Sequence, residues 1–110
     1  MDIFETIERD IPAIRLVGRL DGITSTALQE TLTQYVQNSP SKLILNLSEL
    51  EYVSSAGLRV FLLVQKNLKK QNSEMQFVGL QPIVKEVFAL SGFLKLFQHF
   101  DTLEDALDVH

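Results

Sequence analysis

The sequence predicts an α/β domain built on a mixed, mostly parallel sheet. Apolar and polar residues alternate clearly in segment 13–20, and segments 42–47 and 75–80 are short, largely apolar and bounded by turn residues. Apolar residues at helical spacing follow each of these three segments. Alternating strands and helices favour parallel strands joined by right-handed crossovers. We therefore expect about five strands, the first of them antiparallel, and about four helices.

The antiparallel strand is expected at the N-terminus. Residues 3–8 alternate weakly, and Asp10-Ile11-Pro12 supplies a turn before the clearer alternation of residues 13–20. The two segments therefore predict a hairpin.

The first helix is expected after Asp21-Gly22, which ends the second strand. Thr24-Ser25-Thr26 offers three possible caps. Thr26 also has the spacing of a capping box with Gln29, in which a hydroxyl and a side-chain amide satisfy free backbone groups at a helix start. Asn38-Ser39-Pro40 then predicts the end of this helix.

The middle of the chain predicts a central strand followed by a long helix. Segment 42–47 is aliphatic enough to be buried on both faces of the sheet, and residues 48–51 are expected to be a connector. The helix is expected to reach about Lys70. Its first three turns are apolar almost all round, so we expect them to be covered on more than one side.

The last third repeats the pattern of strand and helix. Pro82 is expected at the start of a helix and Gly92 as its left-handed stop. A short strand at 96–100 and a closing helix from Thr102 complete the prediction.

Length and composition limit the class of protein. The 110 residues predict one domain, residues 1–110, with a net charge of −4, no cysteine and no long basic block. Nucleic acid is therefore not an expected partner, and a disulfide framework is excluded. The acidic start argues against a secretory signal, and the longest apolar run, residues 60–64, is too short to enter a membrane. We expect a cytoplasmic protein.

Catalytic chemistry has few candidates. Of two histidines, His99 is expected to be a partly buried strand residue and His110 to be frayed, so no base is visible for a serine nucleophile. No phosphate loop or metal motif is present, and the acidic residues are typical of solvated surfaces. We expect no enzyme activity, no cofactor and no metal. Six aromatic residues are expected in the core: Phe61, Phe77, Phe88, Phe93, Phe97 and Phe100.

Two serines stand where the central strand gives way to the long helix. Ser54 or Ser55 is the expected helix cap, because the first amides of a helix lack partners and a hydroxyl can accept from them. The same helix start would tolerate a phosphate. Capping alone and a modifiable hydroxyl both remain open interpretations from these residues.

Several motifs in order resemble STAS domains, especially the small bacterial anti-sigma factor antagonists. The resemblance spans nearly the full length. Its motifs are Gly18-Arg19-Leu20-Asp21, the aliphatic strand leading into Leu47 and Leu50, Ser54-Ser55-Ala56-Gly57-Leu58, Pro82-Ile83-Val84 and Leu90-Ser91-Gly92-Phe93.

The resemblance implies that Ser55 is the phosphorylated serine. In the family's motif an aspartate stands at the position of Ser54, and a second hydroxyl residue stands at the position of Ala56. The glycine of the motif matches Gly57. Arg59 stands where a small residue is common, one turn beyond Ser55. Arg59 could contact a phosphate or be a solvated arginine.

The resemblance also implies a partner switch. The unmodified protein would bind an anti-sigma factor with serine-kinase activity, leave it once phosphorylated, and be reset by a serine phosphatase. The alternatives are an unphosphorylated STAS subunit of a transporter or sensory assembly, which Ser54 favours, and a small nucleotide-binding module or enzyme. Asp21 could instead cap the first helix. The expected partner-binding residues are Asp21, Gly22, Ile23, Thr24, Ser54, Ser55, Gly57 and Arg59.

Overall fold

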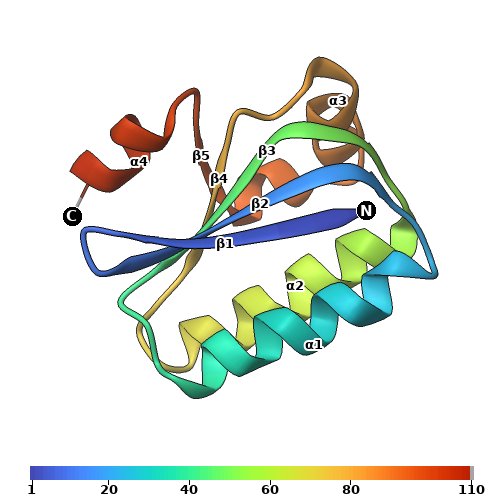
Figure 1. The fold of residues 1–110 in the computed structure, drawn as a ribbon. Coiled ribbons are helices and arrows are strands. Elements are labelled where there is room, and N and C mark those ends of the chain that lie inside the picture. The colour runs from blue at the N-terminus through green and yellow to red at the C-terminus, as the bar shows by residue number, and fades with distance from the viewer. Residues whose placement is uncertain (110) are drawn as a thin grey trace.

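A computed structural model, which describes residues 1–109, contains alternating strands and helices (Figure 1). The order agrees with the sequence prediction. The elements are β1 (Asp2–Glu8), β2 (Ile11–Leu20), α1 (Thr24–Gln37), β3 (Leu43–Val53), α2 (Ser55–Lys69), β4 (Met75–Val78), α3 (Pro82–Leu90), the 3-10 helix η1 (Phe93–Leu96), β5 (Gln98–Phe100) and α4 (Leu103–Asp108).

The strands form one five-stranded sheet in the order β1-β2-β3-β4-β5. β1 pairs antiparallel with β2, with Glu5 opposite Ile14, and every other pair is parallel. The mixed sheet with an antiparallel N-terminal strand is confirmed. β1 lies at one edge and carries Asp2, Glu5 and Glu8.

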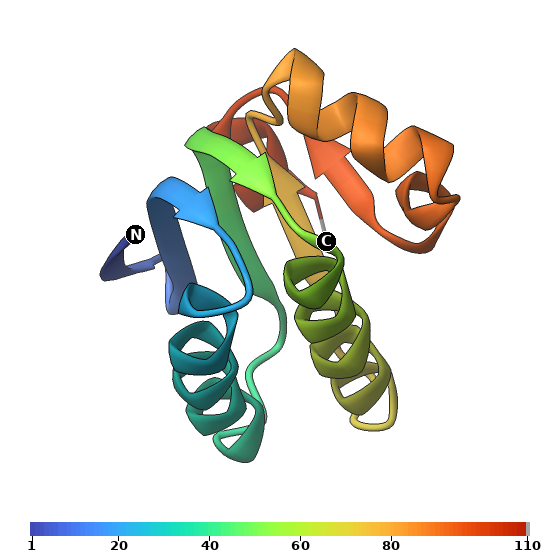
Figure 2. The ribbon, with the colours of Figure 1, turned by 90° about the vertical axis from the view of Figure 1, so that its right-hand side faces the viewer.

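The helices are divided between the two faces of the sheet. α1 and α2 lie side by side (Figure 2), and together with α3 they bury one face in the main core. α4 packs on the other face, where Ala106 and Leu107 meet Ala13, Ile44 and Val78. This division follows from the pleat, since Ile44 points away from its neighbours Leu43 and Leu45.

Four phenylalanines form the centre of the main core. Phe77 lies 5.1 Å from Phe61, 5.1 Å from Phe88 and 4.8 Å from Phe97, measured between ring centroids. The contacts with Phe61 and Phe88 are edge-to-face and that with Phe97 is tilted, and such ring pairs add to the stabilisation from burial. The core prediction is confirmed for these four, while Phe93 and Phe100 are only partly buried.

The central strand is longer than the sequence predicts. β3 continues through residues 48–51, which were expected to be a connector. The pairing between β2 and β3 shifts register twice, between Arg15 and Val17 and between Gly18 and Arg19. Such irregularities let a strand bend and continue without a regular alternation of apolar residues.

The front of α2 is covered on more than one side, as expected, by the sheet and by α1, but two of its apolar residues face outward. Leu62 and Leu63 are 39% and 41% exposed. Gln65 is buried instead, and its side chain donates to the Leu96 carbonyl and accepts from the Met75 amide. A buried amide is compatible with the core because its polar atoms have partners.

The C-terminal third agrees with the predicted stops and starts. α3 begins at Pro82, Gly92 has φ 78°, and the Thr102 hydroxyl accepts from the Asp105 amide at 3.1 Å. The strand β5 is shorter than expected, because residues 93–96 form η1. His99 is exposed on β5, contrary to the expectation of partial burial, and His110 lies outside the described residues.

Lys42 fixes α4 to the start of β3. Its ammonium donates to the Ala106 carbonyl and, at 2.8 Å, to the Val109 carbonyl. Lys42 is only 8% exposed, and burial lowers the pKa of its ammonium. The charge nevertheless has partners, because helix C-terminal carbonyls attract cations.

Candidate functional site

The two serines at the start of α2 have different surroundings. Ser54 has extended backbone geometry, and its Oγ accepts from the Gly57 amide at 3.1 Å. Ser55 is the first helical residue, and its side chain is exposed and forms no hydrogen bond with another residue of 1–109. The sequence left the cap open between the two serines. In the structure Ser54 is the cap, and the Ser55 hydroxyl is free.

Gly57 holds the start of α2 close to the end of β2. A Cβ at position 57 would lie 2.6 Å from Leu20 Cδ2 and 3.1 Å from Val53 Cγ2. The Ser54 amide also donates to the Leu20 carbonyl at 2.8 Å. Gly57 is buried, so it positions the serines and does not offer a contact surface.

The β2–α1 connector lies beside this helix start and is held by its own hydrogen bonds. Asp21 Oδ1 accepts from the Thr24 amide at 2.9 Å and the Ile23 amide at 3.0 Å. The Thr24 hydroxyl lies 3.1 Å from both Asp21 Oδ1 and the Arg19 carbonyl. These bonds, first the one from the Thr24 amide, lower the pKa of Asp21.

Asp21 therefore serves the start of α1. The expected capping box of Thr26 and Gln29 is wrong, because α1 already begins at Thr24. Gly22 and Ile23 are exposed, with Ile23 86% accessible at the tip of the connector. The connector thus presents an apolar side chain on a loop held by its own hydrogen bonds.

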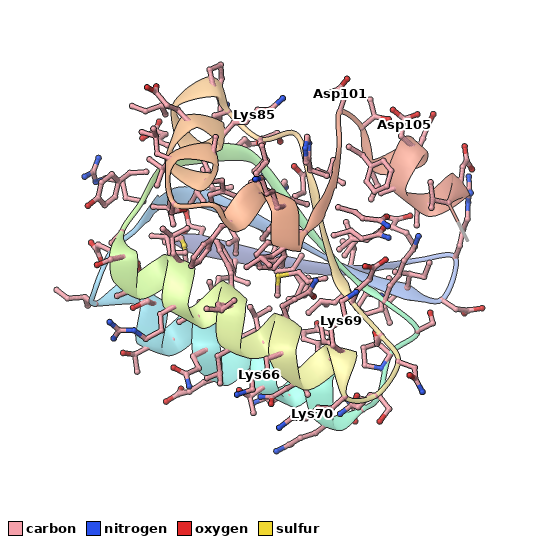
Figure 3. The ribbon with its side chains drawn as sticks, turned by 180° about the vertical axis from the view of Figure 1, so that it is seen from behind. Lys66, Lys69, Lys70, Lys85, Asp101 and Asp105 are labelled. Carbon is pink, nitrogen blue, oxygen red and sulfur yellow. The ribbon has the colours of Figure 1, made fainter. Side chains whose placement is uncertain are left out.

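Arg59 lies one turn beyond Ser55 on α2 and is exposed. Within residues 1–109 it takes part in none of the ion pairs, and α2 has no acidic residue in its first turn. The basic residues Lys66, Lys69 and Lys70 gather at the opposite end of the helix (Figure 3).

An exposed cation and aromatic pair adjoins the site and was missed by sequence reasoning. The Arg19 guanidinium lies 4.3 Å over the Tyr52 ring, where these residues pair at the ends of β2 and β3. Because the register between the two strands is irregular, no pattern in the sequence predicts this pairing.

Other candidate chemistry finds little support in the described residues. A cleft of about 560 Å³ lies near the starts of β3 and β4, at the end of the sheet opposite to the two serines. Its lining includes Lys42, Lys69 and Gln76, but neither serine. Residues 1–109 hold no cluster of three or more side chains suited to a metal ion. Over the same residues, every helix is too short or too polar to cross a bilayer.

The sequence matches the STAS domain family model over residues 5–106. The chain belongs to the STAS domain family. BtrV of Bordetella bronchiseptica, whose name describes an anti-sigma factor antagonist, is 39% identical over 95 residues, covering 83% of this chain and 82% of BtrV.

Solved STAS structures share the fold. An anti-sigma factor antagonist from Mycobacterium paratuberculosis superimposes with a TM-score of 0.88 and 26% identity, covering 96% of this chain and 90% of that one. The unphosphorylated structure of the Bacillus protein SpoIIAA has a TM-score of 0.84 and covers 97% of this chain and 94% of SpoIIAA. Its phosphorylated structure has a TM-score of 0.76 and covers 97% of both chains. At 22% identity, SpoIIAA shows the shared STAS fold alone.

Proposed function

We propose that this STAS protein is an anti-sigma factor antagonist that acts by partner switching. The unmodified protein binds an anti-sigma factor that is also a serine kinase, which releases the sigma factor. Phosphorylation of Ser55 ends the complex, and a serine phosphatase restores the binding form. The protein itself has a binding role without catalysis, and this role places it in the cytoplasm.

The observation that carries this proposal is the free hydroxyl of Ser55 beside the occupied hydroxyl of Ser54. Because Ser54 already caps α2, modification of Ser55 breaks no hydrogen bond of the fold. BtrV and the Mycobacterium paratuberculosis protein, both named as anti-sigma factor antagonists, support the role.

The physical basis of the switch is charge at a protein interface. A phosphate adds about −1.5 to −2 charge at neutral pH, and burying it against a surface suited to a neutral hydroxyl costs binding energy through desolvation and repulsion. The helix N-terminus favours the same charge, so the fold itself is preserved. Phosphorylation therefore weakens the complex without unfolding the protein.

The proposed docking surface joins the start of α2 to the β2–α1 connector. Ile23 is the apolar anchor, because it is 86% exposed on a loop that Asp21 holds rigid. Apolar side chains on preorganised loops lose little conformational entropy on binding. The surface consists of Asp21, Gly22, Ile23, Thr24, Ser54, Ser55 and Arg59, with Gly57 setting the spacing beneath it.

The test is incubation with a cognate anti-sigma factor kinase and ATP, followed by intact-mass measurement. We expect one added phosphate in the parent and in Ser54→Ala, and none in Ser55→Ala. Phosphate on Ser55→Ala, or none on the parent, would contradict the assignment.

Binding provides the second test. Ser55→Asp is expected to weaken affinity for the anti-sigma factor at least tenfold, while the melting temperature stays within about 2 °C of the parent. Ser41→Asp is the matched control. Ser41 is exposed and lies just before β3, at the end of the sheet opposite to Ser55. Equal loss of affinity in both variants would mean that position 55 is not at the interface.

A structural STAS subunit of a transporter or sensory assembly is the second candidate. Ser54 favours it, because this residue replaces the acid that stands before the phosphorylated serine in the family the sequence resembles. Affinity capture that recovers a transport ATPase and no kinase would support this candidate over partner switching.

A further inference from the structure

We propose that Arg59 binds the phosphate on Ser55 and holds it as the dianion against the first turn of α2. This inference rests on the proposed phosphorylation of Ser55. It adds a positioning residue four places beyond the modified serine in α2.

Helix geometry brings the two side chains together. Ser55 and Arg59 are four residues apart in α2, so they lie on the same face one turn from each other. Every Cα–Cβ bond of a helix tilts toward its N-terminus, which directs the long arginine side chain back over the turn that begins at Ser55. An acid placed before a base at this spacing is the more favourable order.

The surroundings leave Arg59 available for this contact. Both residues are exposed, and Arg59 is in none of the ion pairs of residues 1–109. No acidic residue in the first turn of α2 competes for the guanidinium. A guanidinium binds phosphate oxygens in a bidentate manner, which an exposed lysine cannot reproduce.

Arg19 is the other arginine near this edge of the sheet, and it is already engaged. Its guanidinium lies 4.3 Å over the ring of Tyr52, on the neighbouring strand. Arg59 lacks any such contact among the described cation and aromatic pairs. The geometry therefore favours Arg59 over Arg19 as the group that meets the phosphate.

The functional consequence concerns how much charge the modification adds. Phosphoserine has its second pKa near 6, so part of the population carries a single negative charge near neutral pH. A bound guanidinium stabilises the dianion and lowers this pKa, which moves the site closer to a full double charge. Arg59 thereby strengthens the repulsion that ends partner binding.

The test uses protein with phosphoserine inserted at position 55 during translation, so it does not depend on any kinase. The second pKa of the phosphate is measured by phosphorus NMR at low salt in the parent and in Arg59→Met. We expect the pKa to be about 0.2–0.4 higher in Arg59→Met, and the difference to shrink at high salt.

Two further variants complete the experiment. Arg59→Lys should recover part of the difference, because it restores the charge without the planar fork. Lys66→Met removes the same charge from the same helix about 16 Å along the axis from Ser55, and its phosphate should titrate as in the parent. Equal pKa values in the parent and Arg59→Met would overturn the proposal, even if the kinase assay succeeds.

Discussion

Polar side chains occur at both ends of the parallel strands, which we call the amino edge and the carboxyl edge of the sheet, but their environments differ. At the amino edge, where β3 and β4 begin, Lys42 and Gln65 are buried and bound to backbone groups. At the carboxyl edge, Ser55 and Arg59 are exposed and form no side-chain contacts of that kind with residues 1–109. Buried polar groups must be hydrogen-bonded to be tolerated, whereas exposed ones can remain free. The amino edge therefore stabilises the fold, and the carboxyl edge is available to a partner.

The largest expected effect comes from Gly57, a buried residue of the carboxyl edge. Gly57→Val should lower the free energy of unfolding by about 3 kcal/mol, because its side chain would overlap Leu20. Urea unfolding measures this change. Gly22→Val is the control, with no atom within 4 Å of the added Cβ, and should change stability by less than about 0.5 kcal/mol. Similar values for both glycines would show that the tight approach of α2 to β2 is unimportant.

At the amino edge, Gln65→Ala should lower the free energy of unfolding by about 2 kcal/mol. The variant leaves the buried Met75 amide and the partly buried Leu96 carbonyl without their partners. Gln34→Ala removes an exposed glutamine from α1 and should change stability by less than about 0.5 kcal/mol. Both values come from urea unfolding, and a Gln65 effect as small as that of Gln34 would remove the contrast between the two edges.

The adjacent serines provide a finer comparison within the carboxyl edge. Ser54→Ala should cost about 1 kcal/mol of stability, because it deletes the cap of α2. Ser55→Ala should change stability by less than about 0.5 kcal/mol, since its hydroxyl is free. Thermal unfolding monitored by circular dichroism distinguishes the two. A larger effect at Ser55 would identify it as the structural serine.

The smallest expected effect is a titration in the β2–α1 connector. The pKa of Asp21 is lowered in the folded protein by the Thr24 and Ile23 amides, so its contribution is complete above the unfolded pKa of about 3.9. That contribution is lost as the pH falls through the lower, folded value. A pH titration followed by carbon NMR of the Asp21 carboxyl should give a pKa below 3.8. The chemical shift of the Ile23 amide should follow the same titration curve. A midpoint at or above the ordinary value would mean that the connector is not held by Asp21.

The sequence predicted local structure well where a single residue type determines it. Pro82 at a helix start, Gly92 with positive φ and the cap at Thr102 all depend on properties of one residue and its immediate neighbours. The position of the hydroxyl pair at the start of α2 was predicted for the same reason.

The errors concern features that depend on neighbouring elements. The full length of β3 depends on irregular pairing with β2, which no pattern within residues 48–51 reveals. Asp21, and not Thr26, serves α1, because the helix begins three residues earlier than the capping box requires. The exposure of Leu62 and of His99 depends on which face the tertiary structure leaves open.

The charges on β1 affect how copies of the protein meet. An edge strand presents unpaired backbone groups that can extend a sheet from one molecule to the next. If two β1 strands paired antiparallel about their centres, Glu5 would face Glu5 and Asp2 would face Glu8 of the other copy. Repulsion between these carboxylates opposes such growth at neutral pH.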